Sequence, residues 1–117
     1  MADATTGMAD EILGDELEPI MGTGEATELA EMFQALGDAT RLRILSVLDT
    51  VCVPVGTIAE LTGLRQPAVS HHLRILRDRG LVRPEHRGAY TYYCVSSEAL
   101  RSAVHAARLM LVDRKSS

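Results

Sequence analysis

A short amphipathic segment, QPAVSHHLRILRDR at residues 66–79, lies between two glycines, Gly63 and Gly80. Apolar residues recur along it at the three- to four-residue spacing of a single helix face, namely Val69, Leu73 and Leu76. Glycine is typical of the position just after a helix, because it adopts left-handed backbone angles at no steric cost. The pattern therefore predicts a helix that follows one tight turn and ends at a second glycine.

The segments on either side complete an order of elements. A helix is predicted over residues 54–62, with proline in its first turn, and residues 63–65 form the turn that follows it. Two short strands are predicted at residues 81–85 and 89–95, joined by a turn at residues 86–88. A helix, a glycine-containing turn, a second helix and a two-stranded hairpin form a winged helix-turn-helix.

Three further elements surround this unit. Apolar spacing predicts a helix over residues 25–36, and Asp38 is a suitable N-cap for a second one over residues 39–48. A short β-branched patch at residues 51–53 is long enough for one strand bridge, and a last helix begins after Ser96 or Ser97. The predicted fold class is mainly α with a small β-hairpin (α+β).

The net charge of −4 conceals an uneven distribution. Residues 1–40 hold ten acidic residues and no lysine or arginine, whereas residues 41–117 hold twelve basic and six acidic residues. Within the second part, residues 65–87 carry six arginines against two acids, a local charge of +4. A polyanion such as DNA interacts with the local charge of a surface and not with the net charge of the protein, so this segment predicts a nucleic-acid contact. The alternative interpretation is a solvated helix face.

Length and composition exclude several classes of protein. The 117 residues suit one domain, and no apolar run approaches the roughly 18 residues of a membrane helix. The acidic N-terminus is unlike a signal peptide, and two cysteines favour a reducing cytoplasm. We expect a flexible acidic arm at residues 1–24 and a DNA-binding domain at residues 25–115, with dimerisation helices at both ends.

Side chains that can read or hold DNA cluster on the 66–79 helix and the hairpin. Glutamine pairs with adenine, arginine with guanine or phosphate, and serine with either partner type. The predicted DNA-contact residues are Gln66, Ser70, His71, Arg74, Arg77, Arg83 and Arg87. His72 lies about 100° further round the helix and is expected to be a packed, hydrogen-bonded histidine.

The motifs LGDATRLRIL and QPAVSHHLRILRDRGLV, within about residues 29–112, closely resemble the ArsR/SmtB family of bacterial and archaeal transcriptional repressors. The resemblance implies a homodimeric winged-helix repressor that binds an inverted-repeat operator in double-stranded DNA. It also implies that the operator is released when an inducer, often a metal ion, is bound. The first and last helices pair in this family, and the residues expected at the dimer interface are Leu29, Phe33, Leu100, Val104, Ala107 and Leu111.

The sequence departs from the family at its two main metal sites. The thiolate positions of one site fall on Pro54 and Gly56, which carry no ligand. The positions of the other site fall on Ser97, Ala99, Met110 and Asp113, and only Asp113 is a ligand type. His105 and Asp113 remain as weak metal candidates, and histidine with carboxylates suits nickel, cobalt or zinc. The alternative for His105 is an interface or surface histidine.

The two cysteines lie in predicted β segments that approach one another in winged helices. Cys52 precedes the 54–62 helix, and Cys94 lies in the second strand of the hairpin. A redox role requires their Cα atoms to come within about 7 Å. The alternative is two small buried hydrophobic side chains.

The sequence carries no enzyme motif, because it lacks a phosphate-binding glycine loop, an HExxH segment and a nucleophile with a separate base. We therefore predict a DNA-binding repressor that responds to a metal or another stress signal. The alternatives are a protein-interaction module or a thiol sensor on the same fold, working with a separate sensory protein or protein co-regulator.

Overall fold

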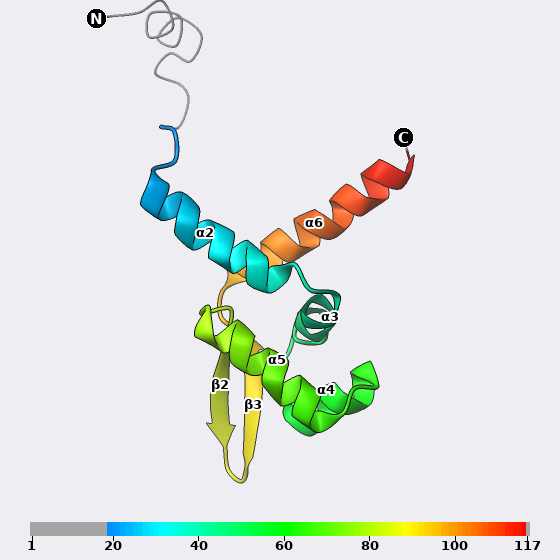
Figure 1. The fold of residues 1–117 in the computed structure, drawn as a ribbon. Helices are drawn as coiled ribbons and strands as arrows, with labels where there is room; N and C mark the ends of the chain where they lie inside the picture. The colour runs from blue at the N-terminus through cyan, green and yellow to red at the C-terminus, as the bar shows by residue number, and fades with distance from the viewer. Residues whose placement is uncertain (1–18, 117) are drawn as a thin grey trace, which may run out of the picture.

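The computed structural model describes residues 19–116, which fold into five helices and one three-stranded antiparallel sheet (Figure 1). The elements in chain order are α2 (Thr23–Leu36), α3 (Ala39–Val47), β1 (Val53–Pro54), α4 (Val55–Thr62), α5 (Gln66–Asp78), β2 (Val82–Arg87), β3 (Tyr90–Val95) and α6 (Glu98–Ser116). The predicted order of helices and strands is confirmed. Most of the expected acidic arm lies outside the described residues, and α2 begins two residues before the predicted position.

Local capping residues set several helix boundaries. The side chain of Asp38 accepts a hydrogen bond of 3.0 Å from the backbone N–H of Arg41, so the predicted N-cap of α3 is confirmed. Ser97 caps α6 in the same way, because its hydroxyl accepts from the N–H of Leu100 at 3.1 Å. Gly63 ends α4 with a φ of +73°, in the left-handed region that glycine adopts freely.

The core lies where α3, α4, α5 and the sheet meet. Its most deeply buried side chains are Ile44, Leu48, Ile58, Val69, Leu73 and Leu76. Two leucines of the same helices are exposed and lie outside this core: Leu42 of α3 and Leu61 of α4. Helical periodicity assigns a residue to a face, but the neighbouring elements decide how wide a stripe of that face is covered.

The first strand of the hairpin ends two residues later than predicted, and the second strand begins one residue later. Strand β2 extends to Arg87, and the connecting loop is Gly88–Ala89, in which only Gly88 has a positive φ. A glycine at the first central position is typical of a type II′ hairpin turn. His86 and Arg87 therefore belong to β2, where they pair with Thr91 and Tyr90, and not to the turn.

Helices α2 and α6 project from the body on the side opposite the hairpin (Figure 1). The C-terminal half of α6 exposes large apolar side chains, among them Leu109, Met110 and Val112. Within residues 19–116, no helix is long and apolar enough to cross a membrane.

Candidate nucleic-acid interface

Helix α5 is fixed to the body along one face. Val69, Leu73 and Leu76 are almost completely buried, and Leu73 retains only 1% of its exposed surface. These three residues recur at spacings of four and three, so they place one stripe of the helix against α3 and α4. The opposite stripe is thereby presented to solvent.

All five predicted contact residues of α5 are on that exposed stripe: Gln66, Ser70, His71, Arg74 and Arg77. In the described part of the chain, the side chains of Gln66, Ser70, Arg74 and Arg77 make no hydrogen bond or ion pair. Their donors and acceptors are therefore available to an external partner, as base and phosphate contacts require.

His72 lies on a different side of α5 from the exposed stripe. Its ring nitrogen Nδ1 is 3.3 Å from a guanidinium nitrogen of Arg41, and the side chain is partly buried. The expectation of a packed, hydrogen-bonded histidine is confirmed. The rings of His71 and His72 meet edge to face, with centroids 5.4 Å apart.

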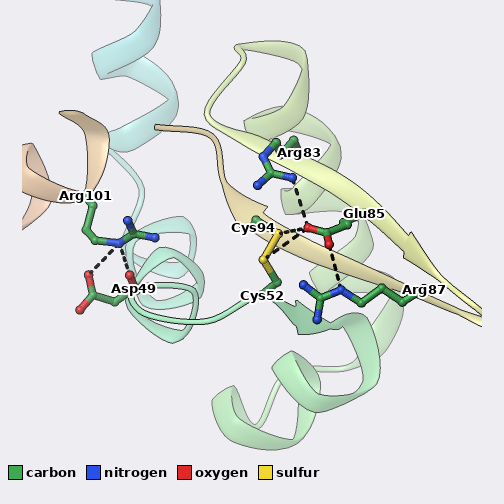
Figure 2. The surroundings of a disulfide bond; sticks show 7 residues. All are labelled: Asp49, Cys52, Arg83, Glu85, Arg87, Cys94 and Arg101. Atoms are coloured by element: carbon green, nitrogen blue, oxygen red, sulfur yellow. Dashed lines mark hydrogen bonds and ion pairs between the residues drawn. A yellow bond between two sulfur atoms is a disulfide. The ribbon is translucent and has the colours of Figure 1, made fainter. Parts of the chain in front are cut away.

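In the wing, formed by β2 and β3, the two arginines predicted to contact DNA both bind the carboxylate of Glu85 (Figure 2). Arg83 lies 3.3 Å from Oε2 of Glu85, and Arg87 donates to Oε1 at 2.9 Å. The guanidinium of Arg87 also stacks over the Tyr92 ring, 4.6 Å from its centroid. The hydrogen bond from Arg87, with the positive charges of both arginines, lowers the pKa of the Glu85 carboxyl. Both arginines remain about half exposed, so they are shared between Glu85 and solvent.

Sequence reasoning did not identify Glu85. Alternate residues of a strand share one face, so Arg83, Glu85 and Arg87 lie in a row on β2. The alternation of charge was visible in the sequence, but the predicted strand ended at Glu85 and placed Arg87 in the turn. A strand extended by two residues would have placed the three side chains together.

The two cysteines lie on the same face and are joined by a disulfide bond (Figure 2). Strand β1 pairs with β3, as expected, and the Cα atoms of Cys52 and Cys94 are 4.4 Å apart. Oε2 of Glu85 lies 3.3 Å from Sγ of Cys94 and 3.8 Å from Sγ of Cys52. We call Cys52, Arg83, Glu85, Arg87 and Cys94 the wing cluster. Across residues 19–116, Cys52, Glu85 and Cys94 are the one group of three ligand-type side chains whose ligand atoms lie close together.

The structure does not bring the two metal candidates of α6 together. His105 and Asp113 are eight residues apart, which corresponds to about 12 Å along a helix axis. Nε2 of His105 instead lies 2.9 Å and 3.0 Å from the two carboxylate oxygens of Asp49, in the loop after α3. Arg101 also contacts Asp49 (Figure 2). The His105 side chain thus serves to join α6 to that loop. Neither of the family's two main metal positions carries a complete ligand set here.

The six residues predicted at the dimer interface do not all lie on one surface of the protomer. Leu100 is 7% exposed and belongs to the protomer's own core, and Val104 packs against that core. An apolar groove of about 570 Å³ lies between α2, α3 and α6. Its apolar lining consists of Phe33, Leu36, Leu42, Ala103, Val104, Ala107 and Leu111. Leu29 is partly exposed on α2, two turns before the end of that helix.

Similarity to known proteins agrees with this geometry. A family described as a helix-turn-helix domain matches residues 36–85. The chain is 31% identical over 74 residues to the transcriptional repressor SdpR of Bacillus subtilis, covering 63% of this chain and 82% of SdpR. It is 38% identical over 77 residues to a transcriptional repressor SmtB homolog of Synechocystis, covering 66% of this chain and 58% of that relative.

A solved structure shares the fold. The homodimeric winged helix-turn-helix DNA-binding domain of a Mycobacterium bovis protein, described as a possible ArsR-family transcriptional regulator, superposes with a TM-score of 0.73. The match covers 83% of this chain and 93% of that one, at 24% identity. Fold, exposed helix and relatives together show that the chain is a DNA-binding transcriptional regulator, and that it belongs to the ArsR/SmtB family of winged helix-turn-helix repressors.

Proposed function

We propose that this protein binds an operator in double-stranded DNA by inserting α5 into the major groove. The observation that carries the proposal is the division of α5 into a buried apolar stripe and an exposed polar stripe. On the polar stripe, the side chains of Gln66, Ser70, Arg74 and Arg77 make no hydrogen bond or ion pair within residues 19–116. An α-helix fits the major groove, and glutamine and arginine side chains recognise adenine and guanine there. Gln66 and Arg74 are assigned to base edges, and Ser70, His71 and Arg77 to bases or phosphates.

The active form is proposed to be a homodimer on an inverted repeat. The apolar groove between α2, α3 and α6 supports this assembly, because Phe33 is 61% exposed and Leu111 is 46% exposed in the protomer. A second copy that covers these side chains would remove them from water. Two-fold symmetry then places the two α5 helices on half-sites about one helical turn apart.

The remaining parts of the chain are assigned by their charge. Arg83 and Arg87 of the wing are proposed to contact phosphate beside the groove that α5 enters. The acidic arm at residues 1–24 is proposed to lie outside the DNA-binding unit, because like charge repels phosphate. We assign the protein to the cytoplasm, where it would meet DNA. Its proposed role is to bind DNA and not to catalyse a reaction.

The experiment is selection of bound duplexes from a random-sequence pool, followed by footprinting and titration of the selected site. If Arg74 contacts guanine, Arg74→Ala should weaken binding by about 1–3 kcal/mol and relax specificity at one base pair in each half-site. Arg114→Ala is a matched control, because it removes the same charge from the far end of α6.

The outcomes separate base contacts from general electrostatics. A uniform loss across sequences in Arg74→Ala would assign that side chain to phosphate. If the affinity for the selected duplex is unchanged in both Arg74→Ala and Gln66→Ala, α5 is not the reading helix and the proposal is wrong.

A further inference from the structure

The disulfide bond joins β3 to the residue that directly precedes β1, at the base of the wing. The register that pairs Val53 with Tyr93 places Cys52 directly opposite Cys94. The cysteines are 42 residues apart in sequence, and the loop closed by the bond contains α4, α5 and β2. Every side chain assigned above to DNA contact therefore lies within this loop.

The fold has a core that does not depend on the bond. Core side chains such as Ile44, Ile58 and Leu73 come from three different helices, and six residue pairs hold β2 against β3. A domain of this size buries enough apolar surface to fold without a cross-link. The two cysteines are therefore held opposite one another in the reduced protein as well as in the oxidised one.

A surface hollow lies beside the two cysteines. The hollow has a volume of about 260 Å³ and is lined by residues that include Val51, Cys52, Cys94 and Arg101. Cys52 is half-buried, whereas Cys94 is only 3% exposed. Thiol–disulfide exchange requires direct attack on an accessible sulfur. A small oxidant or reductant therefore reaches Sγ of Cys52 before Sγ of Cys94.

Glu85 links the sulfur atoms to the wing arginines (Figure 2). Its Oε2 atom is shared by Arg83 and the two sulfur positions, while Oε1 accepts from Arg87. A thiol is a hydrogen-bond donor, but a disulfide sulfur carries no hydrogen. Oxidation therefore removes two donors from Oε2 and leaves Arg83 as its donor within the wing cluster. Reduction restores thiol donors that compete with Arg83 for the same oxygen.

We propose that Cys52 and Cys94 form a reversible oxidation site whose redox state sets how strongly Glu85 holds Arg83. In the disulfide form, Glu85 retains Arg83 and the wing binds phosphate weakly. In the dithiol form, Arg83 is released to phosphate and operator affinity is higher. This inference rests on the proposed function, because its readout is affinity for the operator.

The chemistry balances with a peroxide as the two-electron oxidant. The Cys52 thiolate attacks one peroxide oxygen and the O–O bond breaks, which yields a Cys52 sulfenic acid and a hydroxide that takes up a proton from solvent to become the first water. The Cys94 thiolate then attacks the Cys52 sulfur, the S–O bond breaks, and hydroxide takes a proton to leave as the second water. A dithiol reductant reverses the step through a mixed disulfide and leaves as its own disulfide.

The test compares operator affinity in the two redox states of the full chain. Fluorescence anisotropy with the selected duplex is measured in dithiothreitol, and again after hydrogen peroxide is added and removed. Intact mass reports the bond independently, since its formation removes two hydrogen atoms. We expect oxidation to weaken binding about fivefold or more, within the usual range of coupling between sites.

Variants of the cysteines, of Glu85 and of Arg83 test each step by which the disulfide would change DNA affinity. Cys52→Ser/Cys94→Ser should bind equally before and after peroxide, and Cys52→Ala alone replaces it if the double variant does not fold. Glu85→Gln should still form the disulfide but bind equally tightly in both states, because its neutral amide holds Arg83 weakly. Arg83→Ala should bind weakly in both states. A merely structural bond would lower the thermal midpoint wherever it is absent, in the reduced wild type and in the cysteine variants, without making operator affinity differ between the two redox states.

Any of the following three results would overturn the proposal. A disulfide that forms with no change in affinity refutes the coupling. If zinc added to the reduced protein changes affinity and protects both thiols from alkylation, while peroxide does not change affinity, the wing cluster is a metal site instead. If no duplex is selected in either state, the proposed function fails and the coupling fails with it, and the mass measurement still shows whether the bond forms and breaks.

Discussion

Arg41 shows how much one side chain contributes to positioning α5. Its Nε donates to the backbone carbonyl of Ala35 at 2.6 Å, at the end of α2. Its terminal nitrogen approaches His72 of α5, and its backbone N–H donates to Asp38. The side chain is only 14% exposed, so these contacts are largely shielded from water. Arg41 thereby joins α2, α3 and α5 through one guanidinium group.

Asp38 provides a pH-dependent test of this junction. The backbone hydrogen bond from Arg41, followed by the positive charge of Arg41, lowers the pKa of the Asp38 carboxyl. Because the pKa is lower in the folded chain, the stabilisation is complete above the ordinary aspartate value of about 3.9 and is lost as pH falls through the folded value. We expect Asp38→Ala to lower the midpoint of urea unfolding at pH 7.

The control for this prediction is Asp38→Ser, because serine caps a helix but does not titrate. The serine variant should retain most of the stability at pH 7. The difference in urea midpoint between wild type and Asp38→Ala should shrink below about pH 4, whereas the difference between Asp38→Ser and Asp38→Ala should not. A difference between wild type and Asp38→Ala that is independent of pH would contradict the assigned role.

At the scale of elements, the turn between α4 and α5 sets the direction of α5. Gly63 has a φ of +73°, and no heavy atom lies within 4 Å of the place a Cβ would occupy. The requirement for glycine there is therefore one of backbone conformation and not of space. Thr62 supports the same turn, because its hydroxyl donates to the Ile58 carbonyl at 2.7 Å and is buried.

Gly63→Ala should destabilise the fold by about 1–2 kcal/mol, because an L-residue is strained in the left-handed region. Gly56→Ala is the matched control, since Gly56 lies in α4 with equally open space around it and no positive φ. There the same substitution should be neutral or should stabilise by up to about 1 kcal/mol. Urea unfolding of both variants measures the difference. Equal effects at the two positions would show that backbone conformation is not the reason for Gly63.

At the scale of the whole molecule, the protomer leaves one apolar surface uncovered. Helices α2 and α6 diverge from the body (Figure 1). The apolar groove between them and α3 exposes Phe33, Leu42 and Leu111. Soluble monomers rarely leave large contiguous apolar patches in contact with water. A second copy on this surface would complete the molecule and set the distance between the two α5 helices.

Ala107→Glu should raise the dimer dissociation constant about a hundredfold or more, because an unpaired charge in an apolar interface costs several kcal/mol, roughly. The residue lines the apolar groove, whereas its neighbour Ala106 is exposed and does not. Ala106→Glu is thus a control for the added charge. Sedimentation analysis gives the oligomeric state of both variants. A dimeric Ala107→Glu protein would show that the groove is not the interface.

The sequence alone determined the features that depend on near neighbours. The N-cap at Asp38, the glycine turn at Gly63 and the division of α5 into two stripes arise from residues a few positions apart. Periodicity and capping are local effects, so they were predicted within a residue or two. The exposure of the α5 residues that we propose to contact DNA followed from the same pattern, and the family followed from its motifs.

Only the tertiary structure decided which distant side chains meet. The disulfide between Cys52 and Cys94, the position of Glu85 between Arg83 and Arg87, and the exposure of Leu42 depend on strand register and on the packing of separate helices. Extending β2 by two residues moved Arg87 from a turn into a row with Glu85. The disulfide and the helix packing join segments far apart in the chain, and the row on β2 depends on how far that strand pairs with β3, so their geometry exists only once the core has placed those segments side by side.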